Sequence, residues 1–149
     1  MMTRYVAKED IPQALAMMEI VKEDFAGYKE NEFLEALYKA IDNREALLEE
    51  EEGRMAGMLM FSYQEKELTF LAVMPEFRKQ GVGKRLIKRM AECFEDGDVV
   101  HVITFREGDR KGIAARQCYH SCGFADDKEL MVFDYPCQRM VLKVERAKG

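Results

Sequence analysis

The feature that most constrains this chain is a short basic segment with two glycines, residues 78–83, at the join between an apolar stretch and a helical pattern. The apolar stretch, residues 68–73, predicts a β-strand, and Leu86, Ile87 and Met90 recur beyond the glycines at the spacing of one helix face. The first turn of a helix has backbone N–H groups without intrahelical acceptors, and the helix dipole adds partial positive charge there. This strand–loop–helix unit therefore predicts an anion site, and phosphate is the usual ligand of such sites.

Three kinds of phosphate-binding loop compete for this segment. A P-loop requires Gly-Lys followed by Ser or Thr, but Gly83-Lys84 is followed by Arg85. A Rossmann loop requires Gly or Ala three residues after its second glycine, where this chain has Leu86. The third pattern, Arg/Gln-x-x-Gly-x-Gly/Ala, is satisfied from Arg78 to Gly83. A strand-to-helix turn that needs glycine only for its geometry is the remaining alternative.

The order of the other elements predicts the fold class. We expect, in sequence, a strand at 3–7, helices at 11–25 and 33–41, strands at 44–50, 55–63 and 68–73, a helix after 83, a strand at 99–105, a helix at 111–122, and strands at 130–133 and 139–144. This order is typical of an α/β (α+β) mixed sheet of six to seven strands, with about four helices on both faces. Because a helix connects strands 68–73 and 99–105, these two strands are expected to be parallel.

Five local features carry smaller predictions. Residues 44–50 suggest an edge strand, and the nearly unbroken apolar run 55–63 suggests a strand buried on both faces. The acidic run 49–52 predicts a solvated hairpin tip. Residues 133–138 are expected to form a turn between the last two strands. His101 lies in an apolar strand, which favours a core histidine over a ligand.

Composition bounds the function. The 149 residues are 48% hydrophobic and 34% charged, which is typical of one globular domain spanning 1–149. The net charge of −5 disfavours non-specific nucleic-acid binding. No apolar stretch is long enough to suggest a signal peptide or a membrane span. The four cysteines form no CxxC pair, so we expect no metal site and free thiols in a cytoplasmic protein.

Two blocks of the sequence resemble a known family. Residues 73–86 resemble the coenzyme A signature of the GNAT acetyltransferases, and residues 114–124 resemble the C-terminal helix motif of that family, which commonly ends in Tyr-x-x-x-Gly-Phe. The blocks have the order and separation found in the family. The resemblance implies a V-shaped cleft between two central parallel strands, opened by a bulge in the first of them. One departure is Gly112, where many members have an Asn that helps to bind the cofactor.

The resemblance also implies where acetyl-coenzyme A binds. Backbone groups of the strand that ends near Val73 pair with the pantetheine arm, and the amides of the glycine loop hold the pyrophosphate. The implied cofactor contacts are Ala72, Val73, Arg78, Lys79, Gln80, Gly81, Val82, Gly83 and Lys84. The tyrosine of the second block, which often lies near the thioester sulfur in the family, is Tyr119.

Acetyl transfer to an amine requires removal of an amine proton, donors for the developing oxyanion, and an acid for the leaving thiolate. Tyr119 is the candidate acid, although a packed core tyrosine is the alternative, and Cys118 faces about 100° away on an ideal helix. Glu67 is the candidate base because it opens the strand that leads to the cofactor. Glu65 and Glu107 are rivals, an exposed turn carboxylate is the alternative for Glu67, and a water relay would remove the need for a direct base.

The sequence thus favours an N-acetyltransferase that moves an acetyl group from acetyl-CoA to a primary amine of an unidentified small molecule or peptide. A non-catalytic acyl-CoA-binding or sensory module on the same fold is the first alternative, and a Rossmann-type nucleotide binder is the second. The resemblance is compatible with a homodimer. The acceptor cannot be identified from these residues, because specificity depends on the walls of the cleft.

Overall fold

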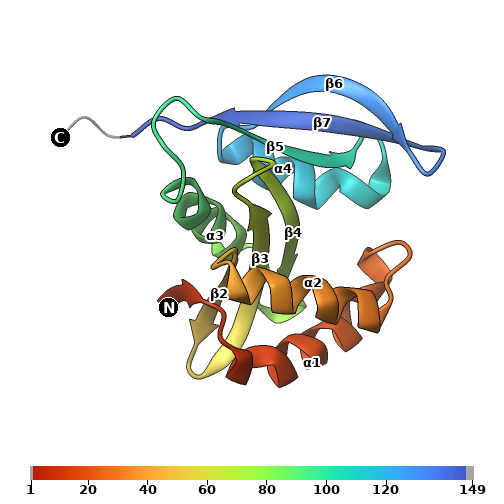
Figure 1. The fold of residues 1–149 in the computed structure, drawn as a ribbon. Coiled ribbons are helices and arrows are strands. Elements are labelled where there is room, and N and C mark those ends of the chain that lie inside the picture. Colours follow the sequence, from red (N-terminus) through yellow and green to blue (C-terminus); the bar gives the residue numbers. More distant parts are fainter. Residues whose placement is uncertain (1, 147–149) are drawn as a thin grey trace.

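A computed structural model describes residues 2–146 and contains a seven-stranded mixed sheet (Figure 1). The strand order is β1-β2-β3-β4-β5-β7-β6, and β4 and β5 are the only neighbouring strands in this described range that run parallel. The strands are β1 (Met2–Tyr5), β2 (Ala46–Glu51), β3 (Arg54–Ser62), β4 (Glu67–Val73), β5 (Val99–Phe105), β6 (Ala125–Val132) and β7 (Tyr135–Lys143). The α-helices are α1 (Ile11–Val21), α2 (Glu30–Asp42), α3 (Val82–Ala91) and α4 (Ile113–Ser121). The predicted mixed sheet and its parallel central pair are confirmed.

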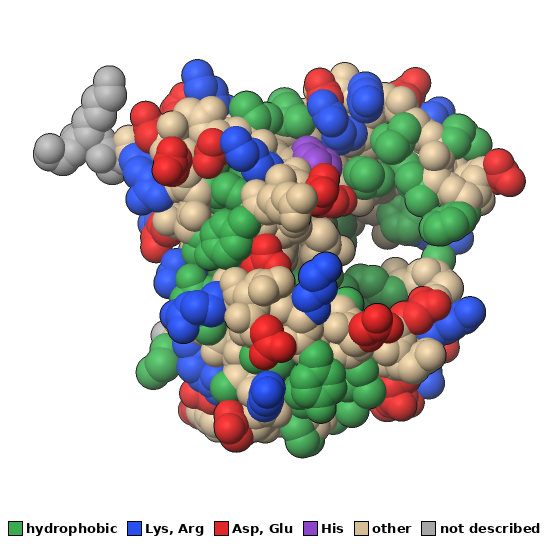
Figure 2. Space-filling view, in the orientation of Figure 1, with side chains coloured by type: hydrophobic (Ala, Val, Ile, Leu, Met, Phe, Trp, Pro, Cys, Tyr) green, Lys and Arg blue, Asp and Glu red, His purple; other side chains and the backbone are tan. Residues whose placement is uncertain are grey.

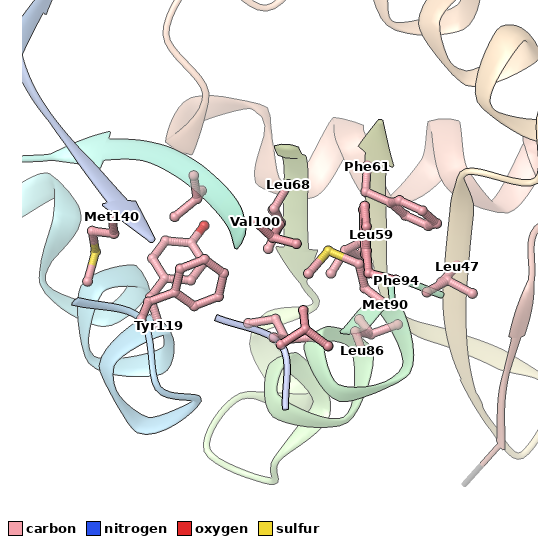
Figure 3. Packing of buried hydrophobic residues seen from close by; sticks show 14 of the residues in the cluster. Leu47, Leu59, Phe61, Leu68, Leu86, Met90, Phe94, Val100, Tyr119 and Met140 are labelled. Carbon is pink, nitrogen blue, oxygen red and sulfur yellow. The ribbon is translucent and has the colours of Figure 1, made fainter. Parts of the chain in front are cut away.

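Helices cover both faces of the sheet, and each face has its own hydrophobic cluster. On one face, α1 and α2 bury residues such as Met18 and Leu37 against β2 and β3. On the other face, α3 and α4 contribute Leu86, Met90 and Tyr119 to a second cluster (Figure 3). The strand β3 serves both clusters, because seven of its nine residues are buried, as its continuous apolar sequence predicted.

The two central parallel strands separate soon after they begin. Their one paired position is Glu67 opposite His101. The register between β3 and β4 shifts next to Met60, and Thr69 is the extra residue of a β-bulge in β4. Figure 1 shows β5 turning away from β4 beyond this point. The bulge and the separation match the V-shaped opening that the family resemblance implied.

Three sequence predictions about local structure are wrong, and two of them concern β2 and the residues that follow it. The strand predicted at 44–50 is not an edge strand, because β1 pairs with the outer side of β2. The acidic run is not a solvated hairpin tip: Glu49 is fully buried within β2, and the turn proper is Glu52-Gly53. Glu49 is stabilised there by a hydrogen bond from Thr3 and an ion pair with Arg85, two partners that are distant in sequence.

The turn predicted at 133–138 is much shorter than expected. Phe133 and Asp134 form it with φ of 48° and 63°, and residues 135–138 belong to β7. Pro136 is tolerated because β7 begins its pairing with β5 only at Cys137, so the missing N–H of Pro136 interrupts no bond on that side. Helix ends also shift by a few residues, as in α1, which gives way to a 3₁₀ turn at Lys22–Asp24.

Candidate functional site

The glycine loop presents backbone N–H groups at the start of α3. Gly81 is the N-cap with φ of 81°, a left-handed conformation that favours glycine, and no side chain caps the helix. The first backbone bond of the helix runs from the Arg85 N–H to the Gly81 carbonyl at 3.0 Å. The amides of Val82, Gly83 and Lys84 therefore precede the hydrogen-bond ladder and are available to an anion.

Gly83 also lacks room for a side chain, because a Cβ there would lie 2.9 Å from the sulfur of Cys118 on α4. The first turn of α3 is thus pressed against α4. This packing fixes the direction in which the loop amides point.

The cations of the loop divide into two groups. Arg78 donates to the Val73 carbonyl at 3.3 Å and forms an ion pair with Asp24, and Arg85 is held by the buried carboxylate of Glu49 at 2.7 Å. The pKa of the Arg85 guanidinium is raised, mainly by its hydrogen bond to Glu49. Lys79 and Lys84, in contrast, form no ion pair within residues 2–146, and both are exposed. Gln80 is also exposed, and its side-chain amide donates to the Glu76 carbonyl at 3.0 Å.

A cleft leads from the loop into the sheet. Figure 2 shows the surface hollowed between the part that carries β5, β6 and β7 and the part that carries α1 and α2, with hydrophobic side chains on its walls. The edge of β4 that faces β5 has no ladder partner beyond Glu67 within the described chain. Ala72 and Val73 lie at the loop end of this strand. Because Met74 donates to the Ala56 carbonyl of β3, the alternation of the ladder also turns the backbone groups of Ala72 toward β3, and those of Val73 face the open side. The Val73 backbone is therefore placed to pair with an extended ligand.

Glu67 and His101 lie side by side at the closed end of the cleft. The Glu67 carboxylate is 3.8 Å from Nε2 of His101, and the two side chains are 27% and 23% exposed. Leu68 and Val100 belong to the cluster under α3 and α4, so their sequence neighbours Glu67 and His101 point to the opposite face. Both polar side chains therefore face the side of the sheet covered by α1 and α2.

Tyr119 lies on the other face of the sheet, in the cluster under α3 and α4. Its side chain is only 6% exposed, and its ring packs against Phe124 with centroids 5.6 Å apart. Figure 3 shows the hydroxyl directed away from α4 toward β5. Burial raises the pKa of Tyr119, which keeps the phenol protonated at neutral pH. The hydroxyl has no hydrogen-bond partner within residues 2–146, yet it is not sealed from solvent as the Tyr28 hydroxyl is.

The remaining candidates lie on loops. Glu65 is exposed in the turn before β4, and Glu107 is exposed in the charged loop after β5. Gly112, at the site of the usual Asn, is buried, and a Cβ there would lie 2.6 Å from Cβ of Phe105. The end of β5 thus fills the space that an Asn side chain would need.

These features define an α/β protein with an anion-binding loop at the mouth of a cleft between two splayed parallel strands. The chain belongs to the acetyltransferase (GNAT) family, whose model matches residues 14–124. Members of this family use acetyl-CoA as the acetyl donor. No curated protein sequence matches the chain significantly.

Solved structures show the same fold over nearly the whole chain. A GNAT-family acetyltransferase from Bacillus cereus ATCC 10987 has a TM-score of 0.78 at 15% identity, covering 97% of this chain and 98% of that one. The ribosomal-protein-S18-alanine N-acetyltransferase from Escherichia coli has a TM-score of 0.73 at 18% identity, covering 99% and 96%. A Salmonella typhimurium protein solved with its cofactor acetyl-CoA has a TM-score of 0.72 at 17% identity, covering 99% and 96%.

Sequence reasoning did not anticipate two parts of this site. It missed the proximity of His101 to Glu67, because the register between two parallel strands is not encoded locally. It also missed the contact between Cys118 and Gly83, which depends on how α3 packs on α4. The bulge at Thr69 was expected only from the family resemblance.

No helix among residues 2–146 is both long and apolar enough to cross a membrane.

Proposed function

We propose that this protein is an N-acetyltransferase that moves an acetyl group from acetyl-CoA to a primary amine. The observation that carries the proposal is the combination of a splayed β4–β5 pair with uncapped amides at the start of α3. An extended, amide-bearing arm fits the unpaired edge of β4, and a diphosphate fits the amides of Val82, Gly83 and Lys84. Few other cofactors combine these two parts.

The side chains around the loop suit the same ligand. Lys79 and Lys84 are exposed cations beside the loop amides, and Gln80 and Arg78 border them. A diphosphate would offset the unfavourable placement of these cations at the positive end of the α3 dipole. Val73 would contribute only backbone groups, and Ala72 would border the arm beside it, so neither position requires a polar side chain.

The proposed chemistry uses the two faces of the cleft. On the α1–α2 face, Glu67 accepts a proton from the attacking amine, directly or through water, and His101 lies close enough to share that role. The amine nitrogen forms a bond to the acetyl carbon while the bond from that carbon to sulfur breaks. On the opposite face, Tyr119 donates its proton to the departing sulfur, and its raised pKa keeps that proton in place beforehand.

The test is acetyl-CoA binding by calorimetry, combined with release of free thiol in the presence of a broad panel of amines. Tyr119→Phe is expected to lower kcat about 10²-fold or more with little change in acetyl-CoA affinity, as for loss of a general acid. Tyr38→Phe, at an exposed position on α2, is the matched control. If turnover survives in Tyr119→Phe, the acid assignment is wrong.

The base is tested in the same assay. Glu67→Gln is expected to lower kcat about 10²-fold, whereas Glu65→Gln and Glu107→Gln are expected to leave it unchanged. A loss of turnover confined to one of these two rivals would move the base to that residue. Tight binding of acetyl-CoA without turnover on any amine would instead favour the acyl-CoA-binding or sensory module.

Three broader points belong to this proposal. Residues 1–149 are proposed to act as one acetyltransferase domain, although Met1 and residues 147–149 lie outside the described range. A cytoplasmic location is supported by four free thiols. A homodimer stays a prediction, which light scattering on the purified protein checks.

A further inference from the structure

A groove of about 660 Å³ lies on the outer side of the α3–α4 contact, and Lys84 is the lining residue that it shares with the proposed diphosphate site. Side chains of α3 form one wall, and the end of α4 and the last residues of β7 form the other. Its polar lining consists of Lys84, Lys88, Ser121, Cys122, Lys143 and Glu145. Three cations therefore face one carboxylate, and none of these lysines forms an ion pair within residues 2–146. The groove is suited to a small anionic molecule.

One thiol lines this groove, and a second lies one helical turn before it. Cys122 is the lining thiol, and Cys118 precedes it by four residues on α4. The Cys118 sulfur is in turn packed against Gly83 of the glycine loop, so it is shielded on that side. Cys122 is therefore the thiol of this pair that borders the groove.

The surroundings of Cys122 favour its thiolate. The hydrogen bond from Cys118 is the main cause that lowers the pKa of Cys122 to about 7, with Ser121 and Lys84 assisting and burial opposing. The pKa of Cys118 is raised by the same hydrogen bond. Cys122 also lies at the C-cap of α4, where the helix dipole disfavours an anion, so the donors and the lysine outweigh that effect. A thiolate that is abundant at neutral pH reacts readily with disulfides.

The other two cysteines lack this combination. Cys137 is buried in β7. Cys93 lies outside the groove, where its thiol is engaged by the Tyr5 hydroxyl and the Arg89 carbonyl. The chain thus contains its own comparison thiols.

We propose that Cys122 is a site of reversible S-thiolation by disulfides of small anionic thiols. The Cys122 thiolate attacks one sulfur of a disulfide RS–SR, the new Cys122–S–SR bond forms, and the other half leaves as the thiolate RS⁻. Excess thiol reverses the step by attacking the mixed disulfide and releasing the Cys122 thiolate. The anionic adduct lies next to Lys84, which the groove shares with the glycine loop, so it competes with a diphosphate there. This last consequence rests on the proposed function, but the modification itself does not.

The experiment treats the reduced, full-length protein with oxidised glutathione at pH 7 and low salt, followed by intact-mass and peptide-mapping spectrometry. We expect one glutathione per chain, on Cys122. Cystamine, a cationic disulfide, serves as the charge control. The rate of each disulfide with the protein is divided by its rate with a small reference thiol. Oxidised glutathione is expected to react faster on this scale, and its advantage is expected to shrink as salt is added. An adduct mainly on Cys93, or equal normalised rates at low salt, would overturn the proposal.

Variants sharpen the assignment. Cys122→Ser is expected to abolish the adduct, and Cys93→Ser is expected to leave it unchanged. Cys118→Ala removes the donor, so the rate at pH 7 is expected to fall about three- to fivefold, because a higher pKa lowers the thiolate fraction more than it raises nucleophilicity. A Cys118→Ala rate equal to that of the wild-type protein would refute the role of the pair. Peptide mapping of the adduct on the wild-type protein does not depend on how the variants fold.

Calorimetry separates the two levels of the argument. Glutathionylated protein is expected to bind acetyl-CoA at least tenfold more weakly than the reduced protein. If the reduced protein does not bind acetyl-CoA at all, the proposed function fails while the mass spectrum still decides whether Cys122 is modified. If the reduced protein binds acetyl-CoA but Cys122 is never modified, the thiolation proposal fails alone.

Discussion

At the scale of single residues, Gly112 shows how packing can replace a family residue. A Cβ at this position would lie 2.6 Å from Cβ of Phe105 and 3.2 Å from its ring. Gly112→Asn is therefore expected to destabilise the protein by about 1–3 kcal/mol, as overpacking of a filled site does. Chemical denaturation of the variant measures this change.

Gly53→Asn is the matched control, because no atom lies within 4 Å of a Cβ there and Asn tolerates the left-handed φ of 77°. Its loss of stability is expected to be smaller. If Gly112→Asn were as stable as wild type, the loop after β5 would have to be more adaptable than the contact with Phe105 implies.

Gly112 and Tyr119 show which properties of single residues the sequence does not predict. Gly112 stands out in the sequence as a departure from the family pattern, but its cause depends on a contact seven residues away across a turn. Tyr119 presents the opposite case: its position on an apolar helix stripe and its match to the motif both follow from sequence. Whether its hydroxyl reaches the cleft depends on the packing of α4 against β5, which no local pattern encodes.

At the scale of elements, the ion pair between Glu49 and Arg85 joins β2 to the first turn of α3. Both carboxylate oxygens of Glu49 accept from the guanidinium, at 2.7 and 2.8 Å, and the Glu49 side chain is 1% exposed. Arg85→Met is expected to cost about 3–5 kcal/mol, because it leaves a buried carboxylate without its cation. Glu49→Leu combined with Arg85→Met is expected to recover most of that loss.

Denaturation of the two single variants and the double variant measures the coupling energy. Arg54→Met is the matched control, since its ion pair with Glu76 is exposed and is expected to contribute little to stability. Additive losses in the double variant would contradict the assignment of Glu49 and Arg85 as one unit.

Elements were predicted from sequence to different degrees, for a physical reason. The helices were found because apolar residues recur at the helical period, as with Leu86, Ile87 and Met90 in α3. The acidic run 49–52 was misjudged because charge patterning describes only neighbours in sequence, whereas the partner of Glu49 lies 36 residues away. The start of β7 was placed too late because Pro136 was taken as part of a turn, and the start of β6 was missed because residues 126–129 are all charged.

At the scale of the whole molecule, the order of elements was sufficient to predict a mixed sheet with one parallel central pair, since a helical crossover makes the strands it joins parallel. The separation of that pair was not readable from element order. It arises where the bulge at Thr69 interrupts the regular register of β4. The solved structures share this fold at 15–18% identity, so the architecture tolerates wide sequence change.

The separation makes a prediction about the molecule as a whole that hydrogen exchange can test. Amides of β4 on the edge facing β5 lack a strand partner beyond Glu67, and those of Val82, Gly83 and Lys84 lack helical acceptors, so both groups are expected to exchange quickly. Acetyl-CoA is expected to slow both groups. Acetyl-pantetheine, which lacks the diphosphate, is expected to slow only the β4 group, and ADP only the loop group.

The helical amides of residues 86–90 are the internal control, because their bonds form without ligand. Protection by ADP along β4, or by acetyl-pantetheine at the loop, would mean that the ligand does not lie along the cleft in this direction, and the roles given to Tyr119 and Glu67 would then lose their geometric basis.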